Sequence, residues 1–111
     1  WEITNRINTG KGPYNIDISA DGKFLVATLK SDAKTLVWEL DKKNPSIISN
    51  NSTVSHGVVI SPDSKYAFVT VEGVGGDPGL VDVIDLEKAK VVSSVNIGKQ
   101  AGGIAFWKIE E

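Results

Sequence analysis

His56 is the only histidine in the chain, and it stands directly before the apolar run 57–60, GVVI. A neutral imidazole at such a place could ligate a metal ion or a haem, or act as a general base. The simpler interpretation is a histidine at the end of a strand that hydrogen-bonds to loop backbone, and this is the one we favour. His56 is therefore a candidate ligand-binding residue.

Two carboxylates, Glu72 and Asp77, flank a loop with four glycines, EGVGGDPG at 72–79. Carbonyl and carboxylate oxygens of such a loop could surround Ca²⁺. The spacing matches no defined calcium loop, so a plain flexible connection is the favoured interpretation. The loop also lacks the phosphate-binding pattern, because no Lys-Ser/Thr pair follows its glycines.

Tyr14 and Lys99 are two further candidates, each placed just before an expected strand. An aromatic ring and an ammonium group at one opening could bind an anion or a sugar, although solvated surface is the simpler interpretation for both. A nucleophile with its base cannot be assembled from one histidine, no cysteine and no Gly-x-Ser-x-Gly. We predict no catalytic residue, no metal site and no cofactor in this chain.

The composition narrows the class of partner. The 111 residues are 41% hydrophobic and carry a formal charge of −2, which is ordinary for a globular domain. The 12 basic and 14 acidic residues nearly cancel, so the chain has no excess positive charge that would attract nucleic acid. No apolar run approaches the ~20 residues that a membrane-spanning helix needs. Nucleic-acid partners and a membrane span are therefore not expected.

The chain contains an internal repeat. Residues 15–28, NIDISADGKFLVAT, match residues 57–70, GVVISPDSKYAFVT, at an offset of 42. Further along, residues 37–40 match 83–86 at an offset of 46, because the second copy has four extra residues in its 72–79 loop. A third start follows at 103–107, and residues 3–10 resemble 91–98. Recurrence at this period indicates a repeat protein.

Each full repeat holds four short β runs, which in the second copy are 57–60, 66–70, 80–84 and 91–95. The segment 85–90 contains good helix formers, but its counterpart includes Asn44-Pro45, which favours a hairpin turn. Four strands per repeat of this length are typical of a β-propeller blade. The predicted fold class is all-β: a β-propeller fragment of two complete four-stranded antiparallel blades with flanking single strands. A β-sandwich, the alternative, would not require the repeat.

These residues resemble the YVTN-type β-propeller repeat found in surface-layer proteins. The resemblance lies in Ser-Pro-Asp-Ser-Lys at 61–65, Phe-Val-Thr at 68–70, Val-Asp-Val-Ile-Asp at 81–85 and Lys-Val-Val at 90–92. The first copy departs from it, with Ala20 in place of proline. The resemblance implies a bacterial or archaeal protein that is periplasmic, on the cell surface or secreted. It is specific for fold and weak for function.

We expect the chain to be the carboxy-terminal part of a larger propeller. Residues 1–12 would be the outer strand of a preceding blade, 13–54 and 55–100 two blades, and 101–111 the inner strand of the next or closing blade. Two blades cannot close a ring. The expected partners are therefore the remaining blades, or other copies associating through open strand edges.

The expected function is a binding or scaffold module that presents a loop face to a protein, a glycan or a small ligand. The alternative is the propeller portion of an enzyme, similar to the haem-binding propeller of nitrite reductases or to a propeller lactonase. A haem or metal enters only in that alternative, with His56 as one ligand.

The expected hydrophobic core combines apolar positions of both repeats with one aromatic residue between the blades. Its members are Ile16, Ile18, Leu25, Val58, Ile60, Phe68, Val83 and Ile104, with Trp38 between blades.

Overall fold

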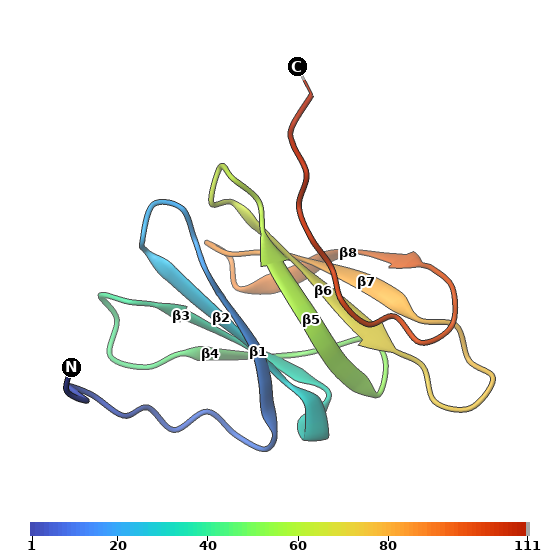
Figure 1. Cartoon of the computed structure of the whole chain (residues 1–111), viewed down its shortest axis with the longest axis horizontal. Coiled ribbons are helices and arrows are strands. Elements are labelled where there is room, and N and C mark those ends of the chain that lie inside the picture. The colour runs from blue at the N-terminus through green and yellow to red at the C-terminus, as the bar shows by residue number, and fades with distance from the viewer. Residues whose placement is uncertain (111) are drawn as a thin grey trace.

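The computed structural model describes residues 1–110 and consists of two four-stranded antiparallel sheets. The first sheet has the order β1-β2-β3-β4 and the second sheet the order β5-β6-β7-β8 (Figure 1). The strands are β1 (Pro13–Ile18), β2 (Phe24–Leu29), β3 (Lys34–Glu39), β4 (Ser46–Ser49), β5 (Val54–Ile60), β6 (Tyr66–Glu72), β7 (Leu80–Asp85) and β8 (Lys90–Asn96), with one 3-10 turn, η1 (Lys30–Asp32). The predicted all-β architecture is confirmed.

The Ser-x-Asp turn of each repeat forms the same hydrogen bonds. The Ser19 hydroxyl donates to Asp21 Oδ1 at 2.6 Å, and the Ser61 hydroxyl donates to Asp63 Oδ1 at 2.5 Å. The residue at the fourth place of the turn has a positive φ, 73° at Gly22 and 62° at Ser64. Ser64 keeps its side chain there because its Oγ accepts the Asp21 amide at 3.1 Å and so links the two turns.

These turns should make the stability depend on pH. Hydrogen bonds from the Ser61 hydroxyl and the Lys65 amide lower the pKa of Asp63 from its ordinary 3.8, and equivalent bonds lower the pKa of Asp21. A lowered folded-state pKa contributes stability that is present above 3.8 and is lost as the pH falls through the folded-state value. Thermal unfolding should therefore move to lower temperature as the pH falls below 3.8, and less so in Asp21→Asn/Asp63→Asn. An equal decline in both proteins would contradict this origin.

The segment after β7 is a turn, as predicted. β7 ends at Asp85, β8 begins at Lys90, and the Lys88 amide donates to Asp85 Oδ1 at 2.9 Å. No helix in residues 1–110 is long and apolar enough to cross a membrane.

The two sheets lie face to face near their inner strands. The Ile60 amide of β5 donates to Asp17 Oδ2 of β1 at 2.8 Å. One hydrophobic cluster joins the facing sides, and a smaller one lies on the other side of the first sheet. The larger cluster contains Phe24, Val26, Val37 and Ile48 from the first sheet and Val58, Ile60, Ala67, Val69, Val71, Ile84 and Leu86 from the second.

The predicted core is correct only for residues between the sheets. Val58 and Ile60 are each 7% exposed, whereas Ile16 is 61% and Ile18 54% exposed. These two isoleucines lie on the side of the first sheet that no other sheet covers. Trp38 also belongs to this side rather than to the space between the sheets, and donates its indole N–H to the Lys42 carbonyl at 3.0 Å. The remaining predicted members, Leu25, Phe68, Val83 and Ile104, are half-buried.

The terminal stretches join neither sheet. No strand is assigned to residues 1–12 or 97–110, so their membership of neighbouring blades stays a prediction. The carboxy-terminal stretch 101–110, here called the tail, crosses the second sheet (Figure 1). The Thr70 hydroxyl donates to the Gly102 carbonyl, just as Thr28 donates to the His56 carbonyl at 2.6 Å. The start of the tail thus stands beside the second sheet as β5 stands beside the first.

Candidate ligand-binding site at the loop face

One end of the two sheets gathers the residues that the sequence singled out. Pro13 at the start of β1 pairs with Leu29 at the end of β2, and the Lys30 amide donates to the Gly12 carbonyl at 2.8 Å. The Thr28–His56 hydrogen bond brings the start of β5 to the same end. We call this end the loop face: residues 11–14, 30–33, 50–56 and 73–79.

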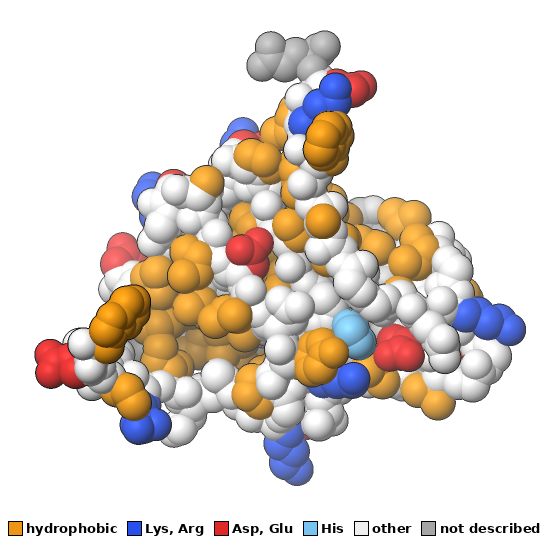
Figure 2. Space-filling model, viewed as in Figure 1, with side chains coloured by type: hydrophobic (Ala, Val, Ile, Leu, Met, Phe, Trp, Pro, Cys, Tyr) orange, Lys and Arg blue, Asp and Glu red, His pale blue; other side chains and the backbone are white. Residues whose placement is uncertain are grey.

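Tyr14, His56 and Lys30 form a cluster on the loop face. The Tyr14 and His56 rings lie 4.6 Å apart between centroids and are inclined by 60°. Lys30 Nζ lies 4.5 Å from the centroid of the Tyr14 ring. Residues 1–110 contain one ion pair, which joins Lys108 to Glu110. The Lys30 ammonium therefore has no carboxylate partner among these residues. The cluster therefore presents an unneutralised cation beside two rings (Figure 2).

The imidazole of His56 has an unused hydrogen-bonding atom. Its Nδ1 is buried and has no partner within residues 1–110. We favoured a His56 ring that hydrogen-bonds to loop backbone, and for Nδ1 this interpretation is wrong. The main-chain carbonyl of His56, and not its ring, accepts a hydrogen bond from the Thr28 hydroxyl. An unpaired buried nitrogen costs free energy unless another group satisfies it.

Within residues 1–110 the other candidates form no ion pair with the side chains of this cluster. Glu72 is the last residue of β6 and pairs in register with Val54. Asp77 is exposed in the glycine-rich loop, where its amide donates to the Val74 carbonyl at 3.4 Å. Lys99 is exposed in the connection from β8 to the tail. Within residues 1–110 no three His, Cys, Asp or Glu side chains gather as a metal site would require.

Sequence reasoning missed Lys30 as a site residue. Its only signal was its place in the short connection between β2 and β3, which reaches the loop face. Lys30 begins η1, which ends at the left-handed φ of 51° of Ala33, and no sequence pattern indicated that turn.

A buried polar network below the loop face was also missed. Asp82 of β7 is fully buried, and its carboxylate accepts hydrogen bonds from the Asn51 amide at 2.9 Å and from Ser94 Oγ at 2.7 Å. The side chains of Asn50 and Asn51 donate to it at 3.1 and 2.9 Å. Asn50 Oδ1 in turn accepts from Thr35 at 2.9 Å and from Ser55 at 2.6 Å. The network ties the β4–β5 connection to both sheets and so positions His56.

Comparison with solved structures identifies the architecture. The chain superposes on hydrazine synthase of Kuenenia stuttgartiensis with a TM-score of 0.68 and 27% identity, over 78% of this chain and 25% of that one. It matches the β-propeller domain of Cps50 (Swd1) from Myceliophteria thermophila with a TM-score of 0.69 and 20% identity, over 91% of this chain and 30% of the other. The two sheets are two blades of a β-propeller.

A third match is a functionally unknown protein of Desulfotomaculum acetoxidans DSM 771, with a TM-score of 0.75 and 24% identity, over 94% of this chain and 33% of that one. The chain thus spans between a quarter and a third of the length of these three proteins. No protein-family model and no curated protein sequence matches it. The likeness at these identities concerns the fold.

Proposed function

We propose that this chain is a binding module of a YVTN-type β-propeller, and that its loop face binds an acidic sugar through Tyr14, Lys30 and His56. The observation that carries the proposal is the Lys30 ammonium, held 4.5 Å from the Tyr14 ring without a carboxylate partner in residues 1–110. A carboxylate on a sugar ring would neutralise this charge, and hydrogen bonds to charged groups are stronger than neutral ones.

The two rings supply the second part of the site. Tyr14 is 54% exposed and offers an amphipathic surface, apolar on its ring and polar at its hydroxyl. The half-buried ring of His56 extends this aromatic surface beside Tyr14, while its Nδ1 is buried and lacks a partner among the described residues. A neutral sugar would use the rings but leave the ammonium unpaired, so the module should discriminate by charge.

Calorimetric titration with a trimer of galacturonate and with the uncharged galactose trimer tests this proposal. We expect binding of the charged trimer only, and weakening by about 10- to 100-fold in Lys30→Ala, because a lost hydrogen bond to a charged group is worth about 1.5–3 kcal/mol. Tyr14→Ala should also weaken binding, because it removes the ring that the sugar packs on. Lys43→Ala is the matched control, since Lys43 is exposed in the turn between β3 and β4 at the opposite end of the sheet. Equal weakening by the control would show that net charge, and not this cluster, attracts the ligand.

A further inference from the structure

The free side of the first sheet repeats, position by position, the side of the second sheet that is buried between the sheets. The repeat relates six residues of the buried side to six residues of the free side. In chain order, the buried residues are Val58, Ile60, Ala67, Val69, Ile84 and Leu86, and their counterparts are Ile16, Ile18, Leu25, Ala27, Trp38 and Leu40. Val58 is 7% exposed where Ile16 is 61% exposed, and Leu86 is 1% exposed where Leu40 is 36% exposed. At these positions the neighbouring sheet covers the side chain in the second repeat and leaves it exposed in the first. We call this free side of the first sheet the receiving face.

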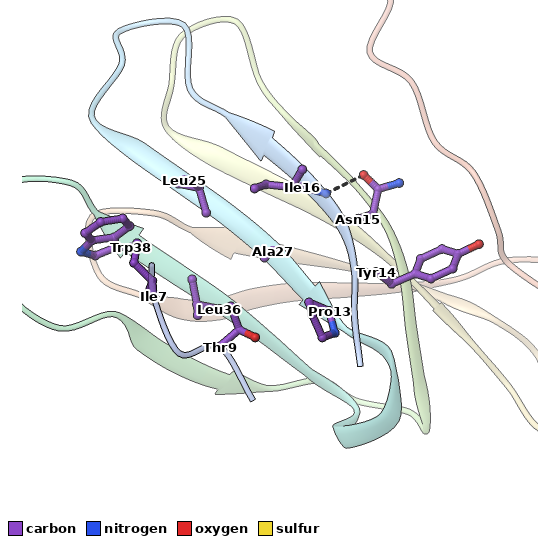
Figure 3. Close-up of a pocket in the computed structure, with 10 residues that line it drawn as sticks. All are labelled: Ile7, Thr9, Pro13, Tyr14, Asn15, Ile16, Leu25, Ala27, Leu36 and Trp38. Atoms are coloured by element: carbon purple, nitrogen blue, oxygen red, sulfur yellow. Dashed lines mark hydrogen bonds between the residues drawn. The ribbon is translucent and has the colours of Figure 1, made fainter. Parts of the chain in front are cut away.

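The receiving face is hollowed and apolar. A hollow of about 320 Å³ lies over it, lined by Leu25, Ala27, Leu36 and Trp38 of the sheet and by Ile7 and Thr9 of the amino-terminal stretch, which must move aside when a second copy binds. Figure 3 shows these side chains converging on the hollow, whereas Tyr14 points away from it toward the loop face. Figure 2 shows the same region as a continuous depression of hydrophobic side chains. Contiguous exposed apolar surface of this kind marks an interaction site.

The free side of the second sheet corresponds to the other half of the same interface. Phe24, Val26 and Val37 of the first sheet enter the cluster between the sheets, and their counterparts in the repeat are Tyr66, Phe68 and Val83. Ile48, which pairs with Thr35, has its counterpart in Val95, which pairs with Val81. Val95 is 52% and Tyr66 37% exposed. We call this side the inserting face.

We propose that the receiving face of one chain binds the inserting face of a second copy, head to tail, in the arrangement that the first and second sheets adopt within one chain. The interface between the two sheets of one chain indicates which surface binds the receiving face. Within one chain, the side of the first sheet that contains Phe24 and Val26 packs on the second sheet, and the inserting face of a second copy is the repeat counterpart of that side. The hollow over Ala27 is large enough for the ring of Phe68. Because two different faces meet, the contact is heterologous, and one face of each kind stays open until repetition of the same rotation closes a ring.

The tail partly occupies the inserting face and must move when a second copy binds. Its contacts there include the Thr70–Gly102 hydrogen bond and the approach of Phe106 to Phe68, 6.1 Å between ring centroids. The tail forms no strand with the second sheet, so its displacement breaks no strand ladder. Tyr14 is the repeat counterpart of His56, whose carbonyl accepts the Thr28 hydroxyl within one chain. In the bound state the carbonyl of Tyr14 in the second copy would therefore accept the hydrogen bond of the Thr70 hydroxyl, in place of the Gly102 carbonyl.

Two charged variants test the proposal, because each blocks one face at an exposed position that the fold does not need. Ile16→Lys blocks the receiving face and Val95→Lys the inserting face. Light scattering of the unaltered chain at tens of micromolar should show association, and each variant alone should associate at least tenfold more weakly. A one-to-one mixture of the two variants should form a dimer and nothing larger, because one good face of each kind remains.

The matched control is Val74→Lys, an exposed apolar residue of the glycine-rich loop that lies on neither face and should associate like the unaltered chain. Circular dichroism confirms that each variant is folded. A monomeric unaltered chain at tens of micromolar would overturn the proposal. So would variants that still associate on their own, since the contact would then be through strand edges or between identical faces.

Discussion

Replacing Asp82 by alanine is expected to lower the free energy of unfolding by about 1–3 kcal/mol, the cost of an unsatisfied buried group, because the half-buried Asn50 would lose its acceptor while the donors on the exposed Asn51 and Ser94 can turn to water. Four donors are affected in all. These donors are the Asn51 amide, the side-chain amides of Asn50 and Asn51, and the Ser94 hydroxyl. Such a loss is a large share of the about 5–15 kcal/mol that stabilises a typical domain. Urea unfolding followed by circular dichroism measures it.

Asp77→Ala is the matched control for this experiment, since it removes the same carboxylate from an exposed loop. Its free energy of unfolding should stay within about 0.5 kcal/mol of the unaltered protein. A loss below about 1 kcal/mol in Asp82→Ala would mean that the network is solvated and does not hold the β4–β5 connection.

Ile84→Ala is expected to cost about 2–5 kcal/mol, the range for truncation of a fully buried aliphatic side chain. Ile84 is completely buried in the cluster between the sheets. Phe68→Ala should cost less than Ile84→Ala despite the larger side chain, because Phe68 lies on the partly exposed inserting face. Both are measured by urea unfolding.

The order of these two losses decides between two views of the molecule. If the faces are assigned correctly, Ile84→Ala lowers the free energy of unfolding more than Phe68→Ala does. A larger loss in Phe68→Ala, measured at a concentration where the chain is monomeric, would mean that the inserting face is buried within one chain.

The repeat made most of the fold predictable. The Ser-x-Asp turns recur at an offset of 42 residues and contain their own hydrogen bonds, so their structure depends on local sequence alone. The turn at 86–89 was also predictable, because the Asn44-Pro45 pair in the other copy argued against a helix.

The core was less predictable because both sides of each sheet are apolar. Period-2 alternation separates the two sides of a strand but does not tell which side has a neighbour. Ile16 and Val58 occupy equivalent positions and look alike in sequence, yet one is exposed and the other buried. Their difference arises from the presence of an adjacent sheet, which is a tertiary property.

The candidate site was predictable in position and not in its contacts. Tyr14 and His56 come from equivalent places in the two copies, so their approach follows from the adjacency of the two inner strands. Lys30 and Asp82 were not found, because a lysine in a short loop and one carboxylate in an apolar strand carry no pattern of their own. Their roles appear only once side chains from separate segments are placed.

The most direct test of the loop-face site is the imidazole signal of His56 in a proton–carbon NMR spectrum, which is free of overlap because the chain has one histidine. Titration with the galacturonate trimer should shift this signal until it saturates, and the galactose trimer should leave it in place. The shift should weaken in Lys30→Ala and persist in Lys43→Ala. A signal that stays fixed at saturating galacturonate, or that moves equally with both trimers, would contradict the assignment of this cluster as the binding site.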